Sequence, residues 1–122
     1  MHWLPDLVFL DIETTGGTPL YHRITEIALI KIENGQKTVA WQSLINPELS
    51  IPRNITGLTG ITNVMVQNAP TFKEMAGDLF SHLQGMVLVA HNCRFDYGFL
   101  KAEFKRLGVT GKVVTPALPL VC

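Results

Sequence analysis

The stretch LVFLDIETTGG, residues 7–17, decides how this chain folds. Residues 7–12 are apolar apart from Asp11, which is typical of a central strand covered on both faces. Asp11 and Glu13 stand two positions apart, so in a strand their carboxylates share one face, roughly 6.5 Å apart, while Ile12 points the opposite way. Such acids can simply end a strand beside a turn. Because uncompensated charges on a core strand are costly, we favour a site where a divalent cation relieves their repulsion and lost hydration.

The segment that follows, residues 14–17, contains two threonines and two glycines. Its hydroxyls and backbone N–H groups are hydrogen-bonding partners for a polar ligand. Gly16 and Gly17 carry no Cβ, so we expect the polar end of a substrate to approach the backbone closely here.

A hairpin is predicted next. Residues 24–32 are β-prone, and residues 37–45 alternate between apolar and polar side chains. Between these runs lies Asn34-Gly35, a dipeptide that accepts positive φ and favours a tight antiparallel turn.

The second half of the chain predicts helices alternating with strands. After an irregular stretch with a short helix over residues 62–67, Thr71 and Glu74 form a capping box. It begins a helix that ends before Gly85. A buried strand over residues 86–91, a second helix over 95–107 and a β-prone end over 113–122 follow. This order predicts an α/β fold with a mixed sheet and helices packed on it.

Composition limits the function classes. The 122 residues, 47% hydrophobic and 16% charged, predict one packed domain. Ten basic and ten acidic side chains balance, which excludes a nucleic-acid binder that relies on bulk positive charge, but not a local site built around metal ions. Short apolar runs and a start without basic residues predict no membrane segment or signal peptide. Cys93 and Cys122 predict neither a disulfide framework nor a zinc site, and so a protein of the reducing cytoplasm.

A third acid, Asp96, falls in the first turn of the second predicted helix. It precedes Phe99 and Leu100 by three and four positions, so it shares their core-directed face. Taken alone, an acid in a first turn is more often a favourable partner of the helix dipole. Taken together with Asp11 and Glu13, we interpret it as a third metal ligand.

Three motifs carry a family resemblance. FLDIETTG at residues 9–16 resembles the first motif of the DEDD (DnaQ-like) 3′–5′ exonucleases, and HNCRFD at 91–96 resembles their second motif, H-N-x-x-F-D. LTGIT at 58–62 is similar to a segment typical of the epsilon proofreading subunit of bacterial DNA polymerase III and its relatives. Each motif is moderately specific. Their order and spacing over nearly the whole chain are highly specific.

The resemblance implies a ribonuclease H-like fold, two Mg²⁺ or Mn²⁺ ions, and stepwise hydrolysis of nucleotides from a DNA or RNA 3′ end. Asp11, Glu13 and Asp96 would be the catalytic metal ligands, with Asp11 bridging both ions. DNA replication proofreading or repair is the implied role, with a DNA polymerase subunit as a possible partner.

The resemblance also implies substrate contacts. Thr14 and Thr15 would line the pocket of the terminal nucleotide, and Leu58 with Thr59 would pack against the last base or sugar. Some relatives carry histidine where Thr59 stands, so that contact is the less secure one.

The chain departs from the family in its third motif, H-x(4)-D, which supplies a fourth carboxylate and a general base. After Asp96 the sequence holds one further acid, Glu103, and no histidine. Glu103 lies roughly 10 Å along the helix from Asp96 and is a poor substitute. His91 we interpret as a hydrogen-bonded, partly buried side chain rather than a base. Residues 1–122 are therefore expected to form a C-terminally truncated, partial exonuclease domain.

Loss of the base removes a contribution of roughly 10²–10⁴-fold, so we expect weak metal binding and little or no hydrolysis by this chain alone. Two alternatives stay open: an RNA-trimming exonuclease of the same family, and a non-catalytic domain that binds nucleic acid or a polymerase.

Overall fold

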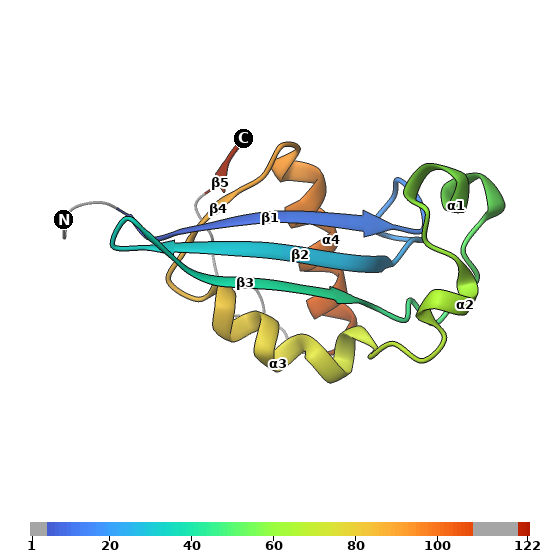
Figure 1. Cartoon of the computed structure of the whole chain (residues 1–122). Coiled ribbons are helices and arrows are strands. Elements are labelled where there is room, and N and C mark those ends of the chain that lie inside the picture. The colour runs from blue at the N-terminus through green and yellow to red at the C-terminus, as the bar shows by residue number, and fades with distance from the viewer. Residues whose placement is uncertain (1–4, 109–119) are drawn as a thin grey trace.

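The computed structural model describes residues 5–108 and 120–122, which form one mixed sheet with helices (Figure 1). The elements, in chain order, are β1 (Leu7–Thr14), β2 (Ile24–Glu33), β3 (Gln36–Leu44), α1 (Arg53–Thr59), α2 (Asn63–Val66), α3 (Phe72–Leu83), β4 (Val87–Val89), α4 (Cys93–Arg106) and β5 (Leu120–Val121). The strand order is β3-β2-β1-β4-β5. This arrangement confirms the predicted α/β fold.

The sheet is antiparallel on one side of β1 and parallel on the other. β1 pairs antiparallel with β2, and β2 pairs antiparallel with β3. Asn34 and Gly35 join β2 to β3 with φ of 53° and 76°, which confirms the predicted hairpin turn. β4 runs parallel to β1, and β5 runs parallel to β4. β1 is therefore the central strand, and the acids it carries lie in the middle of the sheet.

One face of the sheet holds the core. Val8, Leu10 and Ile12 of β1 point to this face and are buried with apolar side chains of α3 and α4. The opposite face is open in the part of the chain that the structure describes: Phe9 is 43% exposed and Ile30 41% exposed. The prediction that β1 is covered on both faces is therefore wrong for the described residues, because their helices pack on one side.

The two long helices begin differently. Thr71 caps α3: its hydroxyl accepts from the Glu74 N–H (3.3 Å), and the Glu74 carboxylate accepts from the Thr71 N–H (2.9 Å). The predicted capping box is thereby confirmed. α4 begins at Cys93, two residues before its predicted start, and its N-cap Asn92 makes no side-chain cap bond.

The remaining differences are local. β4 is shorter than the predicted strand, and α1 was not expected in a stretch with several prolines and glycines. The predicted β-prone end lies partly outside the described residues. Cys93 and Cys122 form a disulfide, with their Cα atoms 5.2 Å apart, contrary to the sequence prediction. The parallel pairing of β5 with β4 brings these distant residues together. No helix among the described residues is long and apolar enough to cross a membrane.

Candidate active site

Asp11 and Glu13 lie on the open face of the sheet, at the carboxyl end of β1. Strand alternation places Ile12 in the core between them, as the sequence predicts. Glu13 stands opposite Glu26 of β2 in the strand register. Partial burial raises the pKa of Glu13 above its ordinary value, and the charges of Asp11 and Glu26 raise it further. The end of β1 is thus a place where negative charge accumulates.

Asp96 comes to the same place from another element, the first turn of α4. It is only 5% exposed. Burial raises the pKa of Asp96 to about 7, and the charges of Asp11 and Glu13 contribute to the rise. Charges perturb a carboxyl group in this way only from nearby, so the structure brings the three predicted carboxylates into one electrostatic neighbourhood.

The donor set fits a hard divalent cation. Three carboxylates that repel one another, one of them buried, are relieved by Mg²⁺ or Mn²⁺, which prefer oxygen ligands. Among residues 5–108 and 120–122, no three histidine, cysteine, aspartate or glutamate side chains already stand at metal-ligand spacing.

A cavity of about 250 Å³ lies directly beside Glu13. It brings together three of the four predicted substrate residues, Thr14, Leu58 and Thr59. Leu58, at the end of α1, is 81% exposed, so it offers apolar surface to a ligand. Ile55 and Phe95 also line the cavity and were not singled out by sequence. Phe95 directly precedes Asp96 inside the second motif, and that position was the available signal.

Thr15, the fourth predicted substrate residue, lies elsewhere. It is fully buried and does not line the cavity. Its N–H donates to the Arg23 carbonyl (2.8 Å), and its hydroxyl accepts from the Arg23 N–H (3.1 Å). The side chain therefore closes the base of the loop over residues 15–23 rather than facing a ligand. Gly16 and Gly17 line the cavity, and Gly16 has a second constraint, because a Cβ there would come within 2.5 Å of the His22 ring.

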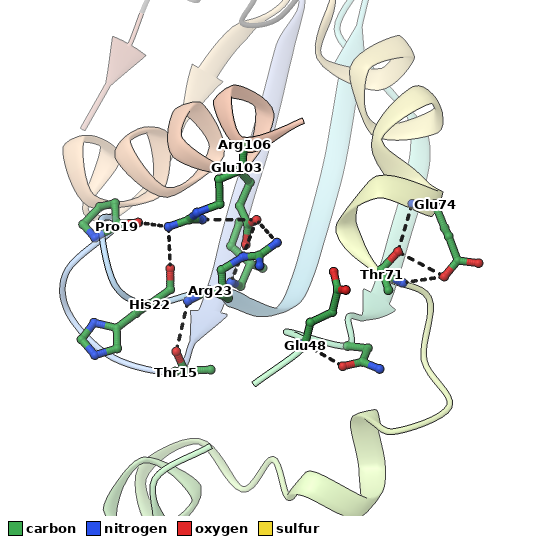
Figure 2. Close-up of polar contacts among 11 residues, drawn as sticks. Thr15, Pro19, His22, Arg23, Glu48, Thr71, Glu74, Glu103 and Arg106 are labelled. Carbon is green, nitrogen blue, oxygen red and sulfur yellow. Dashed lines mark hydrogen bonds and ion pairs between the residues drawn. The ribbon is translucent and has the colours of Figure 1, made fainter. Parts of the chain in front are cut away.

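A buried ionic cluster lies behind this loop (Figure 2). Glu103 of α4 is 1% exposed, and its Oε1 pairs with Arg23 Nη2 (2.8 Å) and Arg106 Nη1 (3.4 Å). Glu103 is therefore a paired structural carboxylate and not a ligand of the site, as its distance along the helix predicts. Sequence reasoning missed the cluster. The signal was an acid placed among Phe99, Leu100 and Phe104, where a charge needs partners.

A second hollow, of about 470 Å³, lies on the open face of the sheet. Phe9, Ile30 and Trp41 are among its lining residues, and Asp11 and His91 also border it. His91 is exposed and accepts or donates no side-chain hydrogen bond among the described residues, so its interpretation as a hydrogen-bonded, partly buried residue is wrong. The end of β4 leaves it at the surface.

Together, a mixed β3-β2-β1-β4-β5 sheet and carboxylates at the end of its central strand define a nuclease-like α/β domain. The RNase_T family model, described as "Exonuclease", matches residues 8–112. The chain belongs to this exonuclease family.

Two curated relatives share the sequence of this chain, and one solved structure shares its fold. The chain is 46% identical over 102 residues to the 3′-5′ exonuclease DinG of Bacillus subtilis, covering 83% of this chain and 11% of that protein. It is 40% identical over 105 residues to DNA polymerase III PolC-type of Caldanaerobacter subterraneus, covering 86% and 8%. E. coli exonuclease I, solved with a dT13 oligonucleotide, shares the fold at a TM-score of 0.75 and 20% identity, over 84% of this chain and 24% of that one. The chain thus spans about a tenth of the length of these curated relatives.

Proposed function

We propose that this chain carries the catalytic carboxylates of a metal-dependent 3′–5′ exonuclease that removes nucleotides from DNA 3′ ends. One observation carries the proposal: Asp11 and Glu13, at the end of β1, lie close enough to the buried Asp96 to help raise its pKa, beside a cavity lined by Thr14 and Leu58. Membership of the exonuclease family supports it, as does the name of the DinG relative.

Each element has a distinct task in the proposed reaction. Asp11 and Glu13 present oxygens from the rigid central strand, and Asp96 presents one from the first turn of α4. Two divalent ions, when bound, would activate a water molecule and stabilise the leaving 3′ oxygen. Leu58 and Thr59 would contact the terminal base or sugar, while Thr14 would border the same nucleotide. A polymerase partner and a role in proofreading or repair belong to this proposal, supported by the PolC-type relative.

The experiment is a cleavage assay with a 5′-labelled single-stranded DNA oligonucleotide and Mn²⁺ or Mg²⁺, and a matched RNA oligonucleotide alongside. We expect products that shorten from the 3′ end one nucleotide at a time. The rate should be roughly 10²–10⁴-fold below that of an enzyme with its general base, because no histidine follows His91. Asp11→Ala should abolish the cleavage, and Asp78→Ala, which removes an exposed acid from α3, should not.

Mn²⁺ titration supplies the second arm. The parent chain should bind Mn²⁺ and Asp11→Ala should not. Cleavage that survives in Asp11→Ala, or a parent chain that binds no divalent ion, would contradict the proposal. DNA binding that needs Mn²⁺ but never leads to cleavage would instead support the non-catalytic alternative, and faster shortening of RNA would support the RNA-trimming one.

A further inference from the structure

Glu103 lies outside the proposed metal site, yet one of its partners, Arg23, ends the loop that follows the site, and another, Arg106, binds that loop's backbone. We infer that Glu103 is a positioning residue: with Arg23 and Arg106 it holds the turn at residues 14–16, which borders the nucleotide cavity, against α4. This inference rests on the proposed function, because it assigns to the same site the device that keeps its substrate pocket in place.

The first step is the set of hydrogen bonds that Glu103 makes at the start of β2. Glu103 Oε1 accepts from Arg23 Nε (2.8 Å), and Glu103 Oε2 accepts from the backbone N–H of Ile24 (2.9 Å). One carboxylate thus binds both the side chain of Arg23 and the peptide that follows it. Charge-assisted bonds made by a buried carboxylate are short and directional. These bonds therefore fix the backbone at Arg23 and Ile24, and do not only neutralise the charge of Glu103.

The second step passes from Arg23 to the turn. Arg23 exchanges two hydrogen bonds with Thr15, through its carbonyl and its N–H. Thr14, the neighbour of Thr15, donates its hydroxyl to the Gly16 carbonyl (2.6 Å) and lines the cavity beside Glu13. The contacts run without interruption from Arg23 to Thr15 and its neighbour Thr14, so a displacement of Arg23 moves the wall of the cavity.

The third step is a second set of contacts between α4 and the loop over residues 15–23. Arg106, one turn after Glu103 on α4, donates to the backbone carbonyls of Pro19 and His22 (Figure 2). His22 in turn accepts the Thr18 N–H at Nδ1 (3.0 Å), and its ring occupies the space beside Gly16. The loop over residues 15–23 is thereby held at several backbone groups by the last turns of a single helix.

α4 itself connects Asp96, in the proposed metal site, with Glu103, which holds the loop. Asp96 and Glu103 are both buried and lie seven residues apart, so they project from nearly the same face of α4. The charges of Asp11 and Glu13 on β1 act on Asp96, while Glu103 binds Arg23 and Ile24 at the end of the loop that follows β1. α4 therefore sets the catalytic acid and the nucleotide pocket relative to each other.

The test compares Glu103→Gln, Arg106→Gln and the double variant with Lys105→Gln, which removes one charge from an exposed neighbour on the same helix. Glutamine preserves the shape of Glu103 and an oxygen for the Ile24 N–H, so the variant keeps the backbone contact and loses the ion pairs. Calorimetry measures the affinity for dTMP in the presence of Mn²⁺, and separately for Mn²⁺ alone. Amide hydrogen exchange follows residues 15–24 and the α3 control segment.

We expect Glu103→Gln to weaken dTMP binding about tenfold, because the cavity wall shifts by less than the roughly 1 Å misplacement that can cost about 10²-fold. Affinity for Mn²⁺ alone should stay within about twofold, and exchange should accelerate at residues 15–24 but not in α3. The double variant should bind dTMP no worse than the weaker single variant, because the two residues act through one cluster. Lys105→Gln should match the parent chain.

A purely structural role gives different results: fewer binding-competent molecules with unchanged dTMP affinity, and faster exchange in α3 as well as in the loop. Either of these results, or unchanged dTMP affinity and loop exchange in Glu103→Gln, would overturn the inference. A parent chain that binds no dTMP would instead count against the proposed function, and loop exchange in the variants would still decide whether Glu103 holds the turn.

Discussion

α4 carries two buried carboxylates of opposite character. Glu103 binds two arginines and a backbone N–H, whereas the neighbouring charges that act on Asp96 are those of two more acids, Asp11 and Glu13. The first is neutralised by the protein itself. The second is left with burial and repulsion, which hold its pKa near 7. The difference teaches how to separate structural buried charge from the charge we propose to be functional: Glu103 has its partners in the chain, whereas the Asp96 carboxylate has no hydrogen-bond or ion-pair partner among the described residues.

Removing the paired carboxylate should have the largest effect. Glu103→Ala leaves the Arg23 guanidinium and the Ile24 N–H without their partner, and we expect a loss of about 3 kcal/mol in the free energy of unfolding. Urea denaturation of the metal-free protein measures this loss. A stability within 0.5 kcal/mol, roughly the scatter of ordinary surface substitutions, would show that the cluster is not a structural tie.

Removing the unpaired carboxylate of Asp96 should raise the free energy of unfolding, the opposite of the effect at Glu103. In metal-free protein at pH 8, Asp96→Asn should raise the free energy of unfolding by about 2 kcal/mol, after allowance for solvent screening at a site open on one side. The same substitution should weaken Mn²⁺ binding. A destabilised Asp96→Asn in EDTA at pH 8 would contradict the contrast between the two acids.

The pH dependence of that gain follows from the pKa of Asp96. The ordinary value is 3.8 and the folded value about 7, so the folded protein holds its proton more tightly than the unfolded chain does. The penalty of ionised Asp96 is therefore absent below about pH 4, grows as pH rises, and is complete above about pH 7. Denaturation at several pH values should show the stabilities of Asp96→Asn and the parent chain converge at low pH. A stability difference between the two proteins that does not change with pH would show that the charge of Asp96 is not its cause.

The smallest expected effects come from substitutions at the N-caps of α3 and α4. Thr71→Ala removes the cap of α3 and should cost about 1 kcal/mol. Asn92→Ala should change stability by only a few tenths of a kcal/mol, because Asn92 makes no side-chain cap bond in α4. Thermal denaturation of the two variants side by side gives the comparison. Equal losses would show that α4 is capped in solution by a contact that the structure does not record.

The sequence predicts the features that depend on neighbours along the chain. The alternation around Ile12, the Asn34-Gly35 turn and the Thr71–Glu74 box are local, and the structure confirms each of them. The resemblance of the motifs pointed to the exonuclease family, which the family match then established. Asp96 was grouped with Asp11 and Glu13 as a metal ligand because three acids together favour a cation site, and the motif resemblance supports that grouping; no local pattern relates residues so far apart.

The contacts that the sequence did not reveal are long-range. Arg23 and Glu103 are separated by 80 positions, and Cys93 and Cys122 by 29, so only the packed fold shows that they pair. Thr15 was assigned to the substrate pocket by the family resemblance, but in the structure it bonds to Arg23. The shift in strand register between Glu13 and Thr14 marks where the chain leaves the regular ladder, and an irregular backbone of this kind redirects side chains.

The most direct test of the central claim, that Asp11, Glu13 and Asp96 share one cation site, is an NMR titration of the Asp96 carboxyl carbon with and without Mg²⁺. We predict an apparent pKa near 7 in EDTA. Saturating Mg²⁺ should lower it by more than one unit, and Asp11→Ala should remove most of that response. A pKa in the ordinary range for aspartate that Mg²⁺ does not change would contradict the account.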